Sequence, residues 1–409
     1  MFLDRACRFL YNGLICNRLF VKGDLPMARL CDPILCSGCT ACASVCPYDC
    51  ISMKSDHEGF RRPVVDTARC VECGLCSKAC PVLNTPSTTH LPLAYAVKNK
   101  DEAVRSVSTS GGVFTLLAEH ILAQGGVVFG AAYDADFKVE HRMVESPQML
   151  SALRGAKYAQ SDLGDSFRQV KQQLALGKKV LFSGTPCQVS GLRAFLGKDE
   201  PNLLLVDLVC HGVPSPAVWA QYLSWRSEQI ADGHRPISVN LRSKDSGWAT
   251  YSVDIRWPYG RNYLAVNRED PFIRAFVGDL CLRPSCHRCS SKGLNRCSDF
   301  TLGDYWGVWD QLPAMHDNRG TSIVLVHSDK AKALWDKLSA AMTVRQADAR
   351  RCMEHNPSAL QSAKYDAENR SSFMHRYSGE DFAALVDELL PKPAQNNSFA
   401  SRLKRLLKI

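Results

Sequence analysis

The chain has 409 residues, of which 45% are hydrophobic and 22% are charged, and its formal net charge is +9 at pH 7. This length suits two or three domains with a large core, and the composition is that of an ordinary soluble protein. No apolar run approaches the ~20 residues that a transmembrane segment needs, and no base-reading motif indicates a nucleic-acid partner.

Residues 1–30 predict a basic, partly amphipathic leader that could cover the module after it. Its first part, Met1–Leu19, mixes charged and apolar side chains, so it lacks the apolar core and the small-residue cleavage site of a secretory signal. Nineteen cysteines without such a signal indicate a reducing compartment and metal or redox use. We therefore expect a cytoplasmic protein.

Eight of the ten cysteines in residues 31–82 form two runs of one spacing, C-x2-C-x2-C-x3-C-P. Bacterial ferredoxins have this spacing, and the fourth cysteine of each run binds the other of two [4Fe–4S] clusters. The pattern therefore predicts a 2[4Fe–4S] ferredoxin-type domain. On this rule, cluster one takes Cys36, Cys39, Cys42 and Cys80, and cluster two takes Cys46, Cys70, Cys73 and Cys76.

Zinc ribbons and a disulfide scaffold are the alternatives for this segment. Zinc sites do not need the third cysteine or the trailing proline, and disulfide frameworks suit short secreted chains, so the complete duplicated pattern favours iron–sulfur clusters. A cluster with four thiolates carries about −2, so two of them lower the formal charge from +9 to about +5. The positive net charge is therefore no evidence for a nucleic-acid partner.

After a linker at 83–92, short apolar strands alternate with helical patterns, which predicts a mainly parallel sheet. We expect one larger domain in two parts, 93–175 and 176–345, followed by C-terminal helices and a tail over 346–409. Strands are expected at 93–97, 127–132, 180–183, 203–209 and 323–326, an antiparallel meander at 237–241, 250–257 and 263–266, and helices at 113–123, 166–176, 188–196 and 331–342. The tail ends in a short basic amphipathic segment at 401–409.

The fold class predicted from this order is α/β with α+β elements. A small 2[4Fe–4S] ferredoxin-like domain precedes a larger mixed α/β domain. In that domain a turn, Ser110-Gly111-Gly112, joins a strand region to a helix. Small residues with free N–H groups at a helix N-terminus make a phosphate cradle, although any such turn can use serine and glycine.

Two further turns place a cysteine after an apolar strand, Cys187 after 180–183 and Cys210 after 203–209. The carboxyl ends of neighbouring parallel strands open into one crevice, so these thiols are expected to face one site. A CxxC pair, Cys286 and Cys289, completes a set of four. Isolated buried thiols, a dithiol–disulfide couple and a zinc site are alternatives, and the spacing slightly favours a third cluster.

Six motifs of this region occur in one order: SGGVFT, GAKYAQS, GTPCQV, DLVCHGVPSP, LRPSCHRC and FTLGDYWG. From about Leu93 to about Val326 the chain thereby resembles the family of coenzyme F420 hydrogenase/dehydrogenase beta subunits, with a ferredoxin module fused in front. The resemblance implies a flavin-binding α/β domain that holds FAD and a third [4Fe–4S] cluster beside the flavin. It also implies electron exchange between the clusters and a two-electron carrier.

The resemblance also assigns residues to these cofactors. It implies that the third cluster is held by Cys187, Cys210, Cys286 and Cys289. It implies contacts to FAD from Ser110, Gly111, Gly112, Lys157, Tyr158, Gln160, Ser161 and Asp304. A surface lysine and a structural turn aspartate are the alternatives for Lys157 and Asp304. Cys281 and Cys297 flank the CxxC pair, so either could replace a ligand.

These inferences predict an iron–sulfur flavoprotein oxidoreductase. FAD accepts one or two electrons, so it could connect the clusters to hydride exchange with a small-molecule carrier or substrate, coenzyme F420 or another conjugated acceptor. An electron donor or acceptor protein, a ferredoxin or a redox-complex subunit, is the expected partner. A non-catalytic electron-transfer subunit and a regulatory iron–sulfur protein without flavin are the alternatives.

Overall fold

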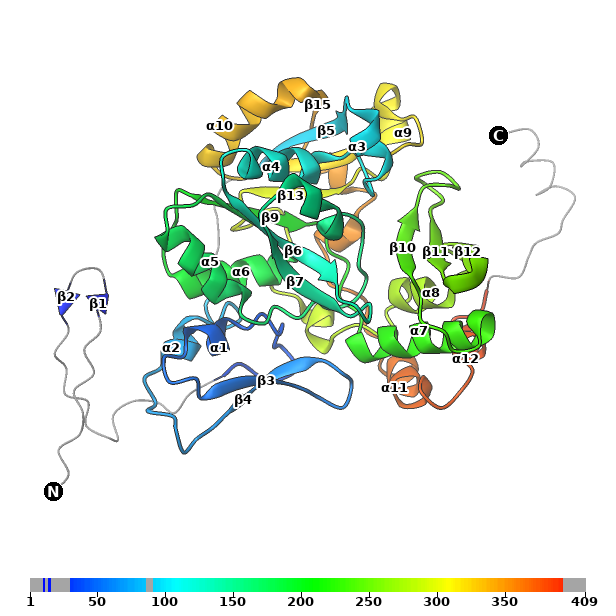
Figure 1. The fold of residues 1–409 in the computed structure, drawn as a ribbon, viewed down its shortest axis with the longest axis horizontal. Helices are drawn as coiled ribbons and strands as arrows, with labels where there is room; N and C mark the ends of the chain where they lie inside the picture. The colour runs from blue at the N-terminus through cyan, green and yellow to red at the C-terminus, as the bar shows by residue number, and fades with distance from the viewer. Residues whose placement is uncertain (1–9, 12–13, 16–29, 86–90, 393–409) are drawn as a thin grey trace, which may run out of the picture.

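Figure 1 shows the computed structural model, which describes residues 10–11, 14–15, 30–85 and 91–392. Of the expected leader it describes Leu30 and a two-stranded ribbon, β1 (Leu10–Tyr11) with β2 (Leu14–Ile15). The expectations for the rest of the leader and for the amphipathic segment at 401–409 lie outside the described residues.

The ferredoxin module is a small duplicated unit. Thr40 and Gly74 have left-handed φ angles, 62° and 72°, and each directly precedes a short helix. The chain therefore turns in the same way between the second and third cysteine of both runs, as a duplicated sequence predicts. The elements of the module are α1 (Ala41–Val45), β3 (Ile51–Ser55), β4 (Arg61–Val65) and α2 (Leu75–Lys78).

The larger domain is built on one eight-stranded sheet. β6, β8, β9 and β13 are parallel to one another, whereas the other neighbouring strands pair antiparallel. The strand order is β15 (Met342–Ala347), β5 (Leu93–Asn99), β14 (Ser322–Val326), β13 (Phe300–Asp304), β9 (Leu203–Leu208), β8 (Val180–Ser183), β6 (Val127–Tyr133) and β7 (Val139–Val144). The α/β fold class is confirmed, with a mixed sheet.

The prediction of a mainly parallel sheet is wrong. β7 follows β6 after the short turn at 134–138, which is too short for a crossover, so the two strands must pair antiparallel. The helix expected at 331–342 ends at Leu338, and its last expected residue begins β15, which returns antiparallel to β5. The sheet therefore continues through both expected parts of the domain and two residues past 345.

Alternate strand residues pack into different cores on the two faces of the sheet. Val180 and Phe182 of β8 join the core that α5 and α6 cover, and Leu181 joins the core that α4 and α10 cover. Cys39 and Ala41 belong to the first of these cores, so the ferredoxin module packs on the α5–α6 face. The helices of the sheet domain are α3 (Glu102–Ser106), α4 (Val113–Leu122), η1 (Pro147–Leu153), α5 (Ser166–Ala175), α6 (Pro186–Leu196), α9 (Val308–Gln311) and α10 (Asp329–Leu338).

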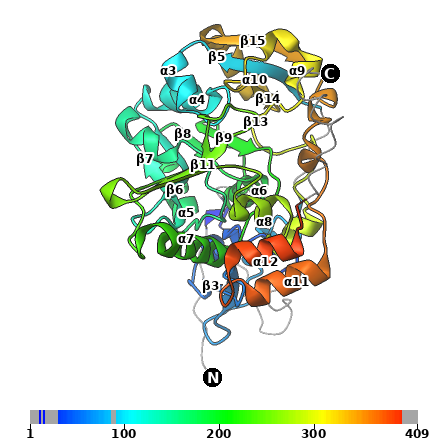
Figure 2. The same cartoon turned by 90° about the vertical axis from the view of Figure 1, so that its right-hand side faces the viewer.

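A second lobe stands at the carboxyl edge of the parallel strands. Its three-stranded antiparallel sheet confirms the expected meander, and its core holds Trp219, Tyr222, Phe272 and Phe382. Figure 2 shows its helices side by side at the lower end of the molecule. The lobe consists of α7 (Pro216–Ala231), β10 (Ser238–Ser243), β11 (Ser252–Arg256), η2 (Pro258–Gly260), β12 (Asn262–Val266), α8 (Pro271–Val277), α11 (Ala367–Arg376) and α12 (Phe382–Leu389).

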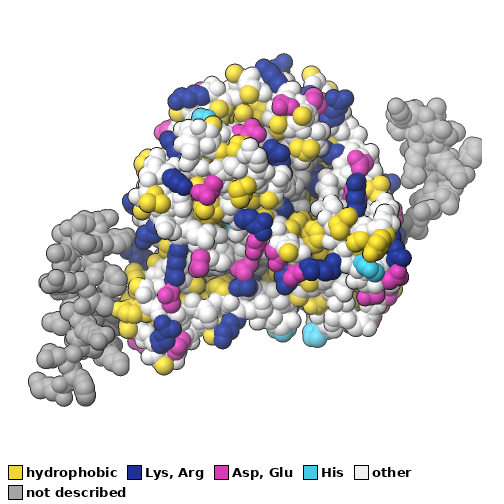
Figure 3. All heavy atoms as spheres, viewed as in Figure 1, with side chains coloured by type: hydrophobic (Ala, Val, Ile, Leu, Met, Phe, Trp, Pro, Cys, Tyr) yellow, Lys and Arg dark blue, Asp and Glu magenta, His cyan; other side chains and the backbone are white. Residues whose placement is uncertain are grey.

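Short 3-10 turns complete the chain: η3 (Pro284–Arg288), η4 (Pro313–Met315), η5 (Ser339–Ala341), η6 (Arg351–Met353) and η7 (Pro357–Ala359). No helix within the described ranges is long and apolar enough to cross a bilayer. On the face that Figure 3 shows, basic and acidic side chains are interspersed. That face therefore offers no extended basic surface for nucleic acid.

Candidate functional site

The four cysteines expected at cluster two line one small cavity in the ferredoxin module. Cys46 and Cys76 are buried, Cys70 is half-buried and Cys73 is exposed. A fifth thiol, Cys50, lines the same cavity, with its Sγ 3.3 Å from that of Cys46. The expected grouping of the four residues is thus present in space, with one of the four thiols exposed to solvent.

The four cysteines expected at cluster one also lie together. Burial raises the pKa of the Cys42 thiol, and the neighbouring thiolates of Cys39, Cys36 and Cys80 raise it further. Cys36, Cys39 and Cys80 are buried. Cys31 is hydrogen-bonded to Cys36 and Cys80, which raises the pKa of Cys31 and lowers that of Cys36 to about 5. Cys31 and Cys50 had no partner assigned from the sequence.

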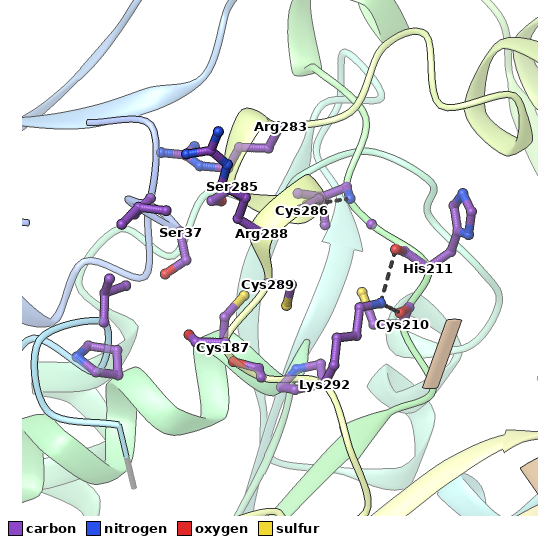
Figure 4. Close-up of a pocket in the computed structure, with 18 of the residues that line it drawn as sticks. Ser37, Cys187, Cys210, His211, Arg283, Ser285, Cys286, Arg288, Cys289 and Lys292 are labelled. Carbon is purple, nitrogen blue, oxygen red and sulfur yellow. Dashed lines mark hydrogen bonds between the residues drawn. The ribbon is translucent and has the colours of Figure 1, made fainter. Parts of the chain in front are cut away.

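The four cysteines expected at the third cluster line a single larger cavity, shown in Figure 4. Cys187 is in the first turn of α6 after β8, and Cys210 follows β9, so the parallel strands bring them to one edge as expected. Cys286 lies in η3, and Cys289 directly follows it. Leu35, Ser37, Pro81 and Val82 of the ferredoxin module form another wall of this cavity.

Basic side chains surround the same cavity. Lys292 Nζ lies 2.6 Å from the carbonyl oxygen of Cys210, to which it donates a hydrogen bond. Arg283, Arg288 and Arg296 also line the cavity. Burial raises the pKa of the Cys210 thiol to about 12, and Lys292 opposes that rise. The cationic lining suits a group that carries net negative charge, as a cluster with four thiolates does.

Within the described residues, no three His, Cys, Asp or Glu side chains gather closely enough to hold a single metal ion. The four thiols expected at cluster two line one cavity and the four expected at the third cluster line another, so each set faces a common space. Cys281 is fully buried in the core of the second lobe, and Cys297 lies 3.3 Å from Ser190 Oγ. Neither lines the cavity, so neither is placed to replace a ligand.

The module is fixed to the large domain by buried polar contacts. Arg370 of α11 makes two hydrogen bonds to the Glu58 carboxylate, at 2.8 and 2.6 Å. Gln160 donates to the carbonyl oxygen of Ser37 and accepts a hydrogen bond from Arg283. Cys36 and the Cys187 cavity are therefore held in one fixed arrangement.

The Ser110-Gly111-Gly112 turn begins α4, as expected. Gly112 is the N-cap of α4 with a φ angle of 83°. The N–H of Gly111 donates to Ser322 Oγ at 2.9 Å, and a β-carbon on Gly111 would lie 2.3 Å from the carbonyl oxygen of Val97. Gly111 is thus required by the close approach of β5 and β14, and its N–H is already used.

The segment 157–161 forms contacts inside the protein. Lys157 Nζ donates to the carbonyl oxygens of residues 152, 154 and 155, and burial lowers the pKa of Lys157 to about 7. Tyr158 packs its ring against Phe276, with 4.9 Å between centroids. Ser161 Oγ lies 2.9 Å from His141 Nδ1 and accepts a hydrogen bond from Gln188. A flavin contact from Lys157 would have to replace one of its carbonyl contacts.

Asp304 ends β13 and is bound on two sides. It accepts a hydrogen bond from Trp248 Nε1 at 2.8 Å and lies 3.0 Å from an Arg242 nitrogen. Arg242 also donates to the Tyr158 hydroxyl at 3.3 Å, and its guanidinium lies over the rings of Tyr251 and Trp306. Asp304 is therefore the partner of a buried arginine that the sequence interpretation missed.

Three buried polar groups at this carboxyl edge have no hydrogen-bond partner among the described residues: Ser110 Oγ, the Tyr133 hydroxyl, and Nε and Nη2 of Arg242. Buried donors without partners are rare in folded proteins, so each needs an explanation such as a ligand, an ion or a water. These are the groups at this edge that could hold a flavin dinucleotide, by its phosphates and its polar ring edge. Arg242 lies in none of the six motifs, so no sequence signal pointed to it. Arg283 lies in the motif LRPSCHRC, but the sequence interpretation assigned it no role.

Comparisons with known proteins match both halves of the chain. Residues 35–84 match the model of the 4Fe-4S dicluster domain. Residues 94–167 and 177–350 match those of the coenzyme F420 hydrogenase/dehydrogenase beta subunit, N-term and C terminus. A subunit of the F(420)H(2) dehydrogenase of Methanosarcina mazei is 23% identical over 190 residues, which are 43% of this chain and 53% of that protein. The chain thus spans about half the length of this relative.

Two further proteins are similar to parts of the chain. Ferredoxin 7Fe of Hydrogenibacillus schlegelii is 36% identical over 64 residues, 15% of this chain and 76% of that ferredoxin. A solved chain of the F420-reducing [NiFe] hydrogenase complex from Methanosarcina barkeri superposes with a TM-score of 0.45 at 15% identity. That superposition covers 65% of this chain and 90% of the other.

The ferredoxin match makes this an iron–sulfur protein of electron transfer. Two family models that describe successive parts of one protein match in order, and together they cover more than half of the chain. The chain therefore belongs to the family of coenzyme F420 hydrogenase/dehydrogenase beta subunits.

Proposed function

We propose that the protein is an FAD- and [4Fe–4S]-dependent oxidoreductase. Its ferredoxin module would exchange single electrons with a partner protein, and its large domain would exchange hydride with coenzyme F420 or another conjugated small molecule. FAD supplies the conversion between one-electron and two-electron chemistry when it is bound. The residues of the chain hold the cofactors, exclude water and set their potentials.

The observation that carries this proposal is the cavity of Cys187, Cys210, Cys286 and Cys289, one wall of which is the ferredoxin module. We assign these four thiols to a third [4Fe–4S] cluster. Arg283 lines this cavity and also donates to the carbonyl oxygen of Cys36, a cluster-one residue. A third cluster here would thus lie between cluster one and the carboxyl edge of the sheet.

The unpartnered donors at that carboxyl edge support a flavin site. Ser110 Oγ lies at the N-terminus of α4, where backbone N–H groups and the helix dipole favour a phosphate. Arg242, with two free nitrogens and aromatic rings on its faces, suits an anionic or conjugated group. Gln160 and Ser161 have their polar atoms in protein hydrogen bonds, so we propose for them a supporting role beneath this site.

One preparation tests the proposal. Protein purified without oxygen should hold about twelve irons per chain, four for each site, and should release FAD on denaturation. Eight irons and no flavin would contradict both the third cluster and the flavin mechanism. Reduction of a dye by reduced F420, or of a conjugated acceptor by reduced ferredoxin, then identifies the hydride partner.

A non-catalytic electron-transfer subunit is the second candidate. It is favoured by the name of the M. mazei relative, which is one subunit of a dehydrogenase. Twelve irons and FAD without turnover of any free carrier, combined with turnover once a partner protein is added, would favour this candidate over an independent enzyme.

A further inference from the structure

One buried arginine joins the two candidate cluster sites. Arg283 is 1% exposed and precedes η3, which carries Cys286. Its Nε donates to the carbonyl oxygen of Cys36 at 2.7 Å, and its Nη2 lies 3.8 Å from Cys36 Sγ. The same side chain lines the cavity that Cys187 and Cys286 line.

The guanidinium is held at this place by further contacts from the module and the large domain. Its Nη1 donates to Gln160 Oε1 at 2.8 Å, and its Nη2 donates to the carbonyl oxygen of Arg61 at 3.0 Å. Its central carbon lies 5.4 Å from the ring centroid of Phe60, and a β-carbon on Gly38 would lie 2.8 Å from one of its nitrogens. The charge therefore has one fixed position.

No carboxylate is bound to this guanidinium in the described residues, because its hydrogen bonds go to carbonyl oxygens, an amide and a thiol. An arginine stays protonated in proteins, so a buried positive charge remains unneutralised here. The cluster ligands beside this charge belong to both sites: Cys36 Sγ lies 3.8 Å from Nη2, and Cys187 and Cys286 line the cavity that Arg283 also lines.

We propose that Arg283 is a positioning residue that raises the reduction potential of the cluster on Cys36 and holds that cluster against the Cys187 cavity. The part that concerns the cavity rests on the proposed third cluster. A cluster becomes more negative when it accepts an electron, so a nearby buried positive charge and an N–H donor to its sulfur stabilise the reduced state. The charge also reduces the repulsion between two anionic clusters.

The test is a redox titration of the anaerobic holoprotein, followed by electron paramagnetic resonance of the reduced clusters. The signal of cluster one is identified as the one that Cys42→Ala loses. Arg283→Gln should lower the midpoint potential of that signal, with a fall of about tenfold or more in the equilibrium constant of reduction. A tenfold change is 59 mV for a one-electron couple. Arg283→Lys keeps the positive charge but loses the guanidinium, which donates several hydrogen bonds at once. This variant should lower the midpoint potential of cluster one by a smaller amount.

Arg370→Gln is the matched control. It removes another buried guanidinium from the same interface, whose hydrogen bonds go to Glu58 and to the carbonyl oxygen of Leu282 and not to a cysteine. The midpoint potential of cluster one in Arg370→Gln should equal that in the wild type. A potential unchanged in Arg283→Gln, or shifted equally in Arg370→Gln, overturns the proposal. If Arg283→Gln does not fold, an unchanged potential in Arg283→Lys overturns it.

The iron content of the wild type separates this proposal from the proposed function. Eight irons with a shifted cluster-one potential would contradict the third cluster and leave the role of Arg283 at Cys36 intact. Twelve irons with an unshifted potential would contradict the role of Arg283 and leave the third cluster intact.

Discussion

Gly191 of α6 lies against Cys39 of the ferredoxin module so closely that a β-carbon on Gly191 would stand 2.8 Å from the Cβ and 2.9 Å from the Sγ of Cys39. The helix that carries Cys187 at its start therefore touches a cluster-one residue one turn later. The absence of a side chain at Gly191 permits this contact between the module and the large domain.

Gly191→Ala should weaken the attachment of the module. In a free helix the change stabilises by about 1 kcal/mol, whereas here the added methyl must displace Cys39, which costs about 1–3 kcal/mol. We expect a lower unfolding temperature and loss of up to about four irons, the content of one cluster, measured by calorimetry and iron assay. Gly379→Ala, where a β-carbon meets nothing within 4 Å, is the control. A Gly191→Ala protein as stable and as iron-rich as the wild type would contradict the contact.

Cys187→Ala should lose about four irons and keep the signals of the two ferredoxin clusters, because Cys187 lines the larger cavity and not the small cavity of cluster two. Iron assay and low-temperature resonance spectra measure this. Cys281→Ala is the matched control, since Cys281 is equally a cysteine of this half but lies in the apolar core. Equal iron loss in both variants, or none in Cys187→Ala, would show that the assignment of the four ligands is wrong.

Ser110→Ala should weaken FAD binding about tenfold, or about 1.4 kcal/mol, because it removes a buried hydroxyl whose partner is proposed to be the ligand. Stability without flavin should not fall, since no hydrogen bond within the described residues is lost. Flavin fluorescence titration measures the affinity. In the control, Ser108→Ala, a hydroxyl that donates to the carbonyl oxygen of Val104 is lost, and flavin affinity should stay the same. Equal FAD affinities in Ser110→Ala and the wild type would contradict the assignment of the Ser110-Gly111-Gly112 turn to the flavin site.

Oxidative damage should begin at cluster two. Cys73 of cluster two is exposed, whereas the ligands expected at the other two sites are buried or half-buried. Because thiol oxidation and cluster loss follow solvent access, brief exposure to oxygen followed by alkylation should label Cys73 first. Mass spectrometry of the labelled peptides measures the order. Earlier labelling of Cys187 or Cys286 would contradict it.

Acid should destabilise the fold through His141. Burial lowers the pKa of His141 to about 4 from its ordinary value of 6.5, so between these values the unfolded chain binds a proton that the folded chain does not. The free energy of unfolding should therefore fall by up to about 3 kcal/mol as the pH drops through this window. His141→Gln should make the free energy of unfolding fall less as the pH drops. His120, His287 and His327, whose pKa burial also lowers, should account for the remaining fall. Anaerobic urea unfolding from pH 7 to 4 measures this. His375→Gln, at an exposed site, should leave the pH dependence unchanged.

Local patterns predicted the local structure well. The duplicated cysteine spacing specifies the turns at Thr40 and Gly74. Two cysteines separated by only two residues can bind the same cluster only if the backbone turns between them. Strand–helix alternation placed β5, β6, β8 and β9 within a few residues. The helix α7 was not predicted, although Ser215 and Pro216 are its N-cap and first residue. These two residues are a common helix-start signal, but the sequence interpretation did not apply that signal by itself.

The larger errors concern partners that are far apart in the chain. Met342 begins β15 because the edge of β5 offers it backbone hydrogen bonds, and no local pattern shows that edge. Asp304 and Arg242 meet only because the second lobe stands over the end of β13. Neither the pairing of β15 with β5 nor that of Asp304 with Arg242 can be predicted from the residues next to them in the sequence.

The sequence by itself determined which residue types and spacings can hold two clusters, and it assembled six motifs into one family. Only the tertiary structure decided that Cys187, Cys210, Cys286 and Cys289 share a cavity, that Cys281 and Cys297 do not, and that Arg283 lies between this cavity and Cys36. The physical reason is that ligand spacing within a run is a property of a short backbone, whereas a cavity between domains depends on packing across the whole chain.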